Sequence, residues 1–89
     1  MKKTPNQCPA CDSRLFISEL TCSNCATRLS GQFPLPALLQ LSPEDQRFVT
    51  DFVLNSGSLK AMAAALGVSY PTVRNRLDDI IQKLKELQP

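Results

Sequence analysis

The 89-residue sequence contains no histidine. This absence excludes histidine metal ligands, Ser-His and Cys-His nucleophile pairs, and the side chain that most often acts as a base near neutral pH. The sequence therefore argues against a hydrolytic enzyme, and we expect a non-enzymatic protein. No binding site for a small-molecule substrate is evident from the residues.

Long apolar segments are also absent, and no stretch is long enough to cross a membrane. The opening residues, MKKTPNQC, resemble the basic start of a secretion signal, but no apolar segment follows them. With 43% hydrophobic and 20% charged residues, the composition is typical of a globular protein. We therefore expect a cytoplasmic protein without a membrane partner.

A large surplus of positive charge is missing as well. The formal net charge is +2, from 10 Lys and Arg against 8 Asp and Glu. Four thiolates around one Zn²⁺ would add −4 + 2 = −2, so the metal-loaded chain would be neutral. Binding to a nucleic acid must therefore depend on local rather than overall charge.

Four cysteines are present, in two C-x-x-C pairs separated by ten residues. In each pair, one tight turn can present two sulfurs to one ion, and two such turns supply a closed tetrahedral site. A segment of this size buries too little apolar surface to fold without help, which gives the metal a structural role. We predict a structural Zn²⁺ held by Cys8, Cys11, Cys22 and Cys25.

Two other interpretations of the cysteines stay open. The four thiols could form two disulfides, although such pairs in the cytosol are usually catalytic and one pair would serve that purpose. Four thiolates also suit iron in a rubredoxin-like centre, which would make the chain a redox protein. Nothing else in the sequence is typical of electron transfer, so zinc is the prediction and iron the alternative.

The cysteine segment resembles the short zinc ribbons of many bacterial proteins, in which glycine follows each pair. Here Asp12 and Ala26 take those positions. Aspartate adopts the left-handed backbone conformation more readily than alanine, so a different turn is expected in the second pair. Between the pairs, residues 14–21 are expected to form a small hairpin that carries the second pair back to the first.

A boundary follows at SGQFPLP, residues 30–36, which contains one glycine and two prolines. We therefore assign a zinc ribbon to residues 1–30, a linker to 31–36 and a helical domain to 37–89. Apolar residues are expected to pack this junction and to join the two parts rigidly; they are Phe33, Leu35, Leu38, Leu39 and Leu41.

Three helices are predicted from their capping residues. Serine suits the position before a helix, and glycine suits a left-handed residue after one. The helices should begin after Ser42, Ser58 and Ser69, with the first ending at Asn55-Ser56-Gly57 and the second at Gly67. The turn between the last two helices is short enough to predict a helix-turn-helix. In the first two helices the core residues should be Phe48, Val49, Phe52, Val53, Leu59, Met62, Ala63 and Leu66.

The third helix, about 69–83, is predicted to be the recognition helix. Its outer crest carries Pro71, Asn75 and Gln82, and Arg74 and Arg76 lie on either side. This layout suits a major groove, because amides can face base edges while cations reach the phosphates. Asp78 and Asp79 would repel phosphates, so contacts should be confined to the first two turns.

The inner face of this helix contains Val73, Leu77, Ile80, Leu84 and Leu87. Their spacing of four and three residues is also that of a coiled-coil seam. Leu84 and Leu87 could instead complete the core beside Phe48 or Phe52, or pack on the ribbon. We favour a homodimer through the C-terminal helix, because a neutral chain with two recognition arginines would bind DNA weakly alone.

The segment GSLKAMAAALGVSYPTVRNRL is similar to the helix-turn-helix of the factor-for-inversion-stimulation family and to the promoter-reading end of sigma factors. The whole chain resembles a little-characterised prokaryotic family of small proteins that pair a zinc ribbon with a helix-turn-helix. The resemblance implies DNA binding. The contacting residues that it implies are Ser69, Tyr70, Thr72, Arg74, Asn75 and Arg76.

These inferences predict a mostly α protein in which a small β zinc ribbon with four cysteines precedes a helix-turn-helix domain. The predicted function is a DNA-binding transcriptional regulator, with double-stranded DNA as its partner and Zn²⁺ as a structural cofactor. The alternative is an adaptor that docks on a protein, such as RNA polymerase or a regulatory partner, without binding DNA directly.

Overall fold

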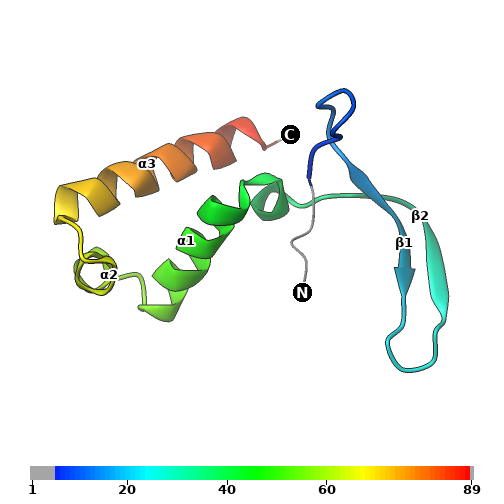
Figure 1. Cartoon of the computed structure of the whole chain (residues 1–89), viewed down its shortest axis with the longest axis horizontal. Helices are drawn as coiled ribbons and strands as arrows, with labels where there is room; N and C mark the ends of the chain where they lie inside the picture. Colours follow the sequence, from blue (N-terminus) through cyan, green and yellow to red (C-terminus); the bar gives the residue numbers. More distant parts are fainter. Residues whose placement is uncertain (1–5, 89) are drawn as a thin grey trace.

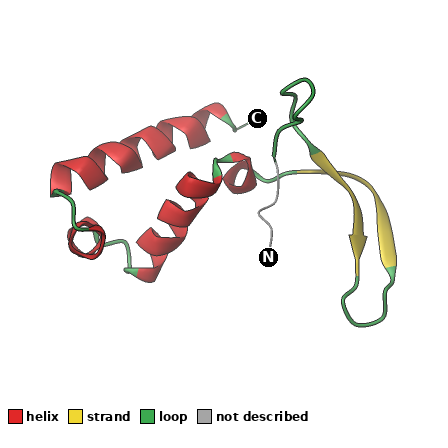
Figure 2. Ribbon diagram, viewed as in Figure 1, coloured by secondary structure: helices red, strands yellow, loops and turns green. Residues whose placement is uncertain are grey.

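The computed structural model describes residues 6–88, so residues 1–5 of the predicted ribbon and Pro89 lie outside the described residues. A two-stranded sheet precedes a set of helices, and the two parts lie side by side in a molecule of 45 × 32 × 23 Å (Figures 1 and 2). The predicted fold class is confirmed. The elements are β1 (Phe16–Thr21), β2 (Arg28–Pro34), the 3₁₀ helix η1 (Ala37–Gln40), α1 (Pro43–Leu54), α2 (Leu59–Leu66) and α3 (Tyr70–Glu86).

The sheet is one antiparallel hairpin formed by β1 and β2. Its register places Ile17 opposite Phe33 and Leu20 opposite Leu29, with one irregularity between Ile17 and Glu19. The small hairpin predicted within residues 14–21 is therefore wrong, because residues 16–21 form one strand that finds apolar partners in β2.

The strand β2 also extends further than the predicted ribbon. It continues to Pro34, so residues 31–34 of the predicted linker are strand. The Phe33 ring explains this, since it lies opposite Ile17 and its Cζ would be 3.2 Å from a Cβ added at Gly31. Pro34 is tolerated because β2 is an edge strand of a two-stranded sheet.

The junction between the sheet and the helices is fixed by backbone carbonyls that accept hydrogen bonds from side chains. The Asn6 amide donates to the carbonyl oxygens of Leu41 (2.9 Å) and Gln40 (3.2 Å). Leu35 and Leu41 are buried, as expected, whereas Leu38 and Leu39 are 49% and 40% exposed. The junction is therefore packed by fewer apolar residues than the sequence predicts.

The predicted helix starts are confirmed. The hydroxyl oxygens of Ser42, Ser58 and Ser69 accept hydrogen bonds from backbone N–H groups in the first turns of α1, α2 and α3. The predicted stop of α2 is confirmed too, because Gly67 has a left-handed φ of 68° and the N–H of Val68 donates to the Ala63 carbonyl (3.1 Å). These caps keep the α2–α3 turn short.

The core lies between the three helices and includes Leu41 from the junction. Its buried residues are Leu41, Phe48, Met62, Ala63, Val73 and Ile80, and Val49, Phe52, Leu59, Leu77, Leu84 and Leu87 pack against them. The assignment of Val53 and Leu66 to the core is wrong, since they are 69% and 51% exposed. Both residues lie in the last turns of their helices.

Leu84 and Leu87 also bear on the predicted dimer. Both pack against the protein's own core, which is the alternative that the sequence left open. They therefore do not form an uncovered seam on α3.

Replacing Ala63 with leucine should lower the free energy of unfolding by about 1–3 kcal/mol, because the added atoms overfill the core. Ala63 is only 8% exposed and lies on the face of α2 that joins the core. Ala64, the next residue of the same helix, is exposed and offers the matched control. Urea unfolding should show little change for Ala64→Leu, and an equal loss in both variants would contradict this packing.

Candidate metal and nucleic-acid sites

The first pair of cysteines lies in a tight turn before β1, here called the first knuckle (residues 8–13). The N–H of Asp12 donates to the Cys8 carbonyl (2.8 Å), and the N–H of Cys8 donates to the Ser13 carbonyl (2.8 Å). The N–H of Ala10 points at the Cys8 sulfur, with an N···S distance of 3.4 Å. Asp12 has a left-handed φ of 60°. These hydrogen bonds therefore fix the backbone that carries the two sulfurs.

The second knuckle (residues 22–27) connects β1 to β2 and repeats this geometry. The N–H of Ala26 donates to the Cys22 carbonyl (3.0 Å), and the N–H of Cys22 donates to the Thr27 carbonyl (2.8 Å). The N–H of Asn24 is 3.4 Å from the Cys22 sulfur. Ala26 has a φ of 62°, so the expectation of a different turn is wrong. The hydrogen bonds offset the cost of a left-handed alanine, which is about 1–2 kcal/mol.

A hydroxyl group stands beside the last sulfur of each knuckle. The Thr27 hydroxyl is 3.0 Å from the Cys25 sulfur, and this contact is the main cause that lowers the pKa of the Cys25 thiol. Ser13 has the same role in lowering the pKa of Cys11. Sequence reasoning missed these two residues, although the repeated pattern C-x-x-C-x-Ser/Thr marks them. A lowered pKa favours the thiolate, which is the form that binds metal.

The structure does not bring all four cysteines together. The first knuckle lies at one end of the β1–β2 hairpin and the second knuckle at the other end (Figure 1). Between them runs the six-residue strand β1, which spans about 20 Å at 3.3 Å per residue. Within residues 6–88, no three Cys, His, Asp or Glu side chains are grouped to hold a metal. Each knuckle has the donor chemistry of half a four-thiolate zinc site.

The predicted DNA-contacting residues lie at the start of α3, immediately after the Gly67 turn. The Ser69 hydroxyl accepts from the Thr72 N–H (3.3 Å) and is 2.8 Å from the Thr72 hydroxyl, so both hydroxyls stabilise the helix start. Tyr70 is 52% exposed, and Asn75 is exposed one turn later. This end of α3 therefore offers a phenol and an amide to solvent.

The two arginines of α3 have different surroundings. Arg74 Nε is 3.5 Å from Asp78 Oδ1 on the same helix, and about half of each side chain is exposed. Arg76 instead points toward α1, where its guanidinium is 3.5 Å from Asp45 Oδ1 and 5.4 Å from the centre of the Phe48 ring. The expectation that both arginines flank an outer crest is therefore met by Arg74 alone.

Asp45 is the partner that fixes Arg76. It is 6% exposed, and its second oxygen accepts from the Lys83 ammonium at 2.7 Å. Burial raises the pKa of Asp45, but Lys83, the Ser42 hydroxyl and Arg76 outweigh it and hold the pKa below its ordinary value of 3.8. The ion pairs join the start of α1 to the middle of α3 through Arg76 and to its last turn through Lys83.

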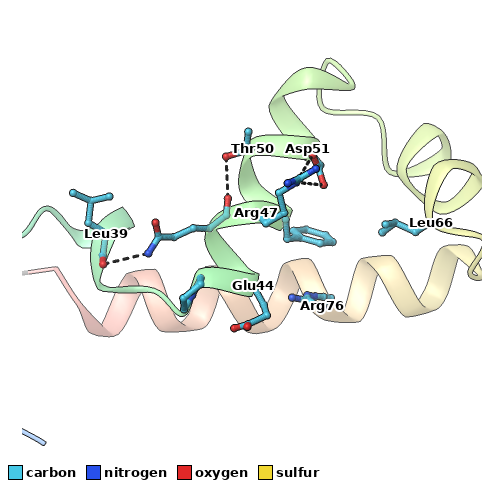
Figure 3. Close-up of a pocket in the computed structure, with 10 residues that line it drawn as sticks. Leu39, Glu44, Arg47, Thr50, Asp51, Leu66 and Arg76 are labelled. Atoms are coloured by element: carbon cyan, nitrogen blue, oxygen red, sulfur yellow. Dashed lines mark hydrogen bonds and ion pairs between the residues drawn. The ribbon is translucent and has the colours of Figure 1, made fainter. Parts of the chain in front are cut away.

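A groove lies between α1, α3 and the end of α2 (Figure 3). It has a volume of about 580 Å³. Leu39, Phe48 and Leu66 give it an apolar lining, and Glu44, Arg47, Asp51 and Arg76 place charges around that lining. Arg47 and Asp51 are paired at 3.3 Å.

Across residues 6–88, none of the helices combines the length and the apolar character that crossing a bilayer requires.

Comparison with known proteins gives two matches, which lie one after the other along the chain. A family model described as "DUF2089 zinc ribbon" matches residues 8–39. A second, described as "Domain of unknown function (DUF2089)-HTH", matches residues 41–87. No curated protein and no solved structure matches the chain. The similarity to the inversion-stimulation and sigma-factor types stays a prediction. The second family model covers more than half of the 89 residues, and the chain therefore belongs to the DUF2089 family, with a zinc ribbon followed by a helix-turn-helix domain.

Proposed function

We propose that this protein is a transcriptional regulator that binds double-stranded DNA through the first two turns of α3. The observation that carries the proposal is the exposure of Tyr70, Arg74 and Asn75 directly after a capped helix-turn-helix turn. In this arrangement the start of the second helix is free to enter a major groove. The protein needs no catalytic group for this role.

Arg74 is the cation best placed to reach a phosphate. Its pair with Asp78 is exposed, and such surface pairs contribute about 0–1 kcal/mol. Arg74 can therefore exchange Asp78 for a phosphate at little cost. Arg76 is held by a buried carboxylate and an aromatic ring, so we assign it to the orientation of α3 rather than to DNA.

Asn75 is the candidate for reading a base. It is exposed next to Arg74, and the asparagine amide can form two hydrogen bonds with adenine in the major groove. Tyr70 and Thr72 lie on the preceding turn and would contact the backbone or a thymine methyl group. Asp78 and Asp79 limit the contact to this end of the helix by repelling phosphates.

We also propose that Cys8, Cys11, Cys22 and Cys25 hold a structural Zn²⁺. The matching knuckles and the hydroxyls beside Cys11 and Cys25 support this assignment, because they favour thiolates in two similar pairs. The ion would supply the stability that a two-stranded hairpin lacks by itself. It has no part in recognition of the bases.

Replacing Arg74 with alanine should weaken binding to all DNA sequences and reduce the slope of log K against log salt by about 0.9, the value of one phosphate contact. The matched control is Arg47→Ala, which removes an arginine from the equivalent i,i+4 pair on α1. Fluorescence anisotropy with a labelled duplex at several salt concentrations measures both variants. Equal losses for the two variants would contradict the assignment of α3 as the recognition helix.

A protein-docking adaptor is the second candidate, and the groove between α1 and α3 is the observation that favours it. Its apolar residues, Leu39, Phe48 and Leu66, lie beside charged groups, as in many protein-binding grooves. Salt-dependent DNA binding separates the two functions. If the parent protein binds no duplex at low salt while Leu66→Asp loses a protein partner, the adaptor function is the correct one.

A further inference from the structure

We propose that the groove between α1 and α3 binds one short amphipathic helix of a partner protein, whose apolar stripe is flanked by a basic residue. Arg76 is the part of the lining that α3 supplies, whereas the residues proposed to contact DNA lie outside the groove. The inference therefore goes beyond DNA binding and does not rest on it. It gives the groove that favours the adaptor function an occupant of stated chemistry.

The apolar lining of the groove gives the first reason. Leu39 and Leu66 lie at opposite ends of it (Figure 3), and they are 40% and 51% exposed. Between α1 and α3 the lining includes Phe48, which belongs to the core. Apolar side chains that stay half exposed in the folded chain favour a partner that removes them from water. Because both ends are open to solvent, a small molecule would leave them partly uncovered, whereas a longer apolar surface covers both.

The length of the groove gives the second reason. Its wall on α1 extends from Pro43 to Asp51, which is about 12 Å at 1.5 Å per residue. Apolar residues at positions i, i+3 or i+4 and i+7 of a helix cover about 10 Å, because seven residues separate the first from the last. The groove therefore matches the apolar stripe of one helix of two to three turns.

The charges around the groove give the third reason. Arg47 is paired with Asp51 at 3.3 Å, and Arg76 is paired with Asp45 at 3.5 Å. Glu44 is exposed and forms no ion pair within the part of the chain that the structure describes. The groove therefore has one carboxylate whose charge its own residues leave uncompensated. A lysine or arginine on the partner helix would complement this charge.

DNA and a second copy of this chain fit the groove less well. A phosphate would be repelled by the Glu44 carboxylate. A second copy would have to present an apolar stripe on the surface of a helix, but each of its three helices packs its own stripe into the core. Among the described residues of these helices, the large apolar side chains that stay exposed do not recur three or four residues apart; they are Val53, Leu54, Leu66, Tyr70 and Ile81. The occupant is therefore a helix of another protein.

Selection from a library of helical peptides tests the inference. The library displays alanine-based helices of about three turns, in which the variable positions are leucine, alanine, glutamine, lysine or glutamate, and the full-length parent protein is the bait. We expect the selected peptides to have leucines at i, i+3 or i+4 and i+7, with a lysine beside this stripe. Fluorescence anisotropy with the labelled synthetic peptide then measures its affinity for the parent and for the variants below.

A first pair of variants tests the apolar contact. Leu66→Asp places a charge at one end of the groove, and Val53→Asp places the same charge on an exposed residue outside it. Both residues lie in the last turn of a helix, so the two changes are matched in position. We expect Leu66→Asp to weaken peptide binding about tenfold or more and Val53→Asp to leave it unchanged. Urea unfolding checks that both variants are folded.

An exchange of charges tests the contact with Glu44. A peptide in which glutamate replaces the lysine should bind the parent about five- to tenfold more weakly than the selected peptide. Glu44→Lys should weaken binding of the selected peptide by a similar factor and restore binding of the exchanged peptide. Asp79→Lys reverses an exposed carboxylate outside the groove and should restore nothing. Unfolding of a variant cannot produce such a recovery.

The outcomes separate this inference from DNA binding. If the folded parent selects no helix, or selects helices whose binding survives Leu66→Asp, the groove is not a site for a partner helix. Selected helices without a basic residue, or no recovery with Glu44→Lys, would also overturn the inference. Arg74→Ala should keep the full affinity for the peptide, because Arg74 lies outside the groove. A parent that binds the peptide and no duplex would overturn the DNA-binding function alone.

Discussion

Replacing Cys22 with serine should release the zinc and unfold the ribbon while the three helices stay folded. Structural zinc contributes about 10–16 kcal/mol of apparent binding free energy in small domains, and losing one thiolate removes most of it. The buried cluster of the helical domain contains no residue of β1 or β2, so its packing survives. Elemental analysis gives the metal content, and circular dichroism at 222 nm follows the helices.

Ser23→Ala is the control for this change, because it alters the same knuckle without removing a sulfur. It should retain one zinc per chain and the parent's thermal transition. A Cys22→Ser protein that keeps its full metal content would show that this sulfur is not a ligand. Loss of the helical signal in the same variant would show that the two parts fold as one unit.

Replacing Asp45 with asparagine should lower the free energy of unfolding by about 1–3 kcal/mol. The change keeps the side-chain shape but removes the charge that Lys83 and Arg76 contact at 2.7 and 3.5 Å. Both cations are about half exposed, so water compensates part of the loss. Asp51→Asn is the matched control, because its pair with Arg47 is on the surface. This change should lower the free energy of unfolding by less than about 0.5 kcal/mol. Urea unfolding measures the difference.

The same aspartate predicts how stability depends on pH. Its pKa is lower in the folded chain than its ordinary value of 3.8, so the unfolded chain takes up the proton first as the pH falls. The stabilisation is complete above about pH 5, begins to fall as the pH nears 3.8, and is fully lost only below the lowered pKa of the folded chain. The difference in free energy of unfolding between the parent and Asp45→Asn should therefore become smaller in acid. If this difference stays constant from pH 7 to pH 3, the ion pairs of Asp45 do not contribute to stability as stated.

Local features could be predicted from the sequence because they depend on neighbouring residues. A serine cap acts on an N–H group three residues away, and Gly67 ends α2 through its own backbone conformation. The inner face of α3 follows from helical periodicity alone. The two C-x-x-C turns are equally local, which explains why both turns could be predicted, although the left-handed conformation of Ala26 was not.

Features that depend on distant residues could not be predicted in this way. Asp45 precedes Arg76 by 31 residues, and their contact exists only because α1 crosses α3 at that level. From the sequence alone, without knowledge of this contact, Arg76 is interpreted as a second residue that binds phosphate. The place of the knuckles depends on whether residues 16–21 turn back or pair with β2, and the register of Leu20 with Leu29 decides this.

The Asn6 side chain joins the ribbon to the helical domain through the carbonyls of Gln40 and Leu41, two residues before Cys8, the first of the proposed zinc ligands. Because Leu41 belongs to the helical core, ordering of the first knuckle and ordering of that core share one set of hydrogen bonds. If the chain binds zinc and DNA as proposed, any coupling between the two sites is reciprocal: the factor by which zinc changes the affinity for DNA must equal the factor by which DNA changes the affinity for zinc. With positive coupling, a chain that had lost its zinc would release DNA more readily, and a chain that had lost DNA would release zinc more readily.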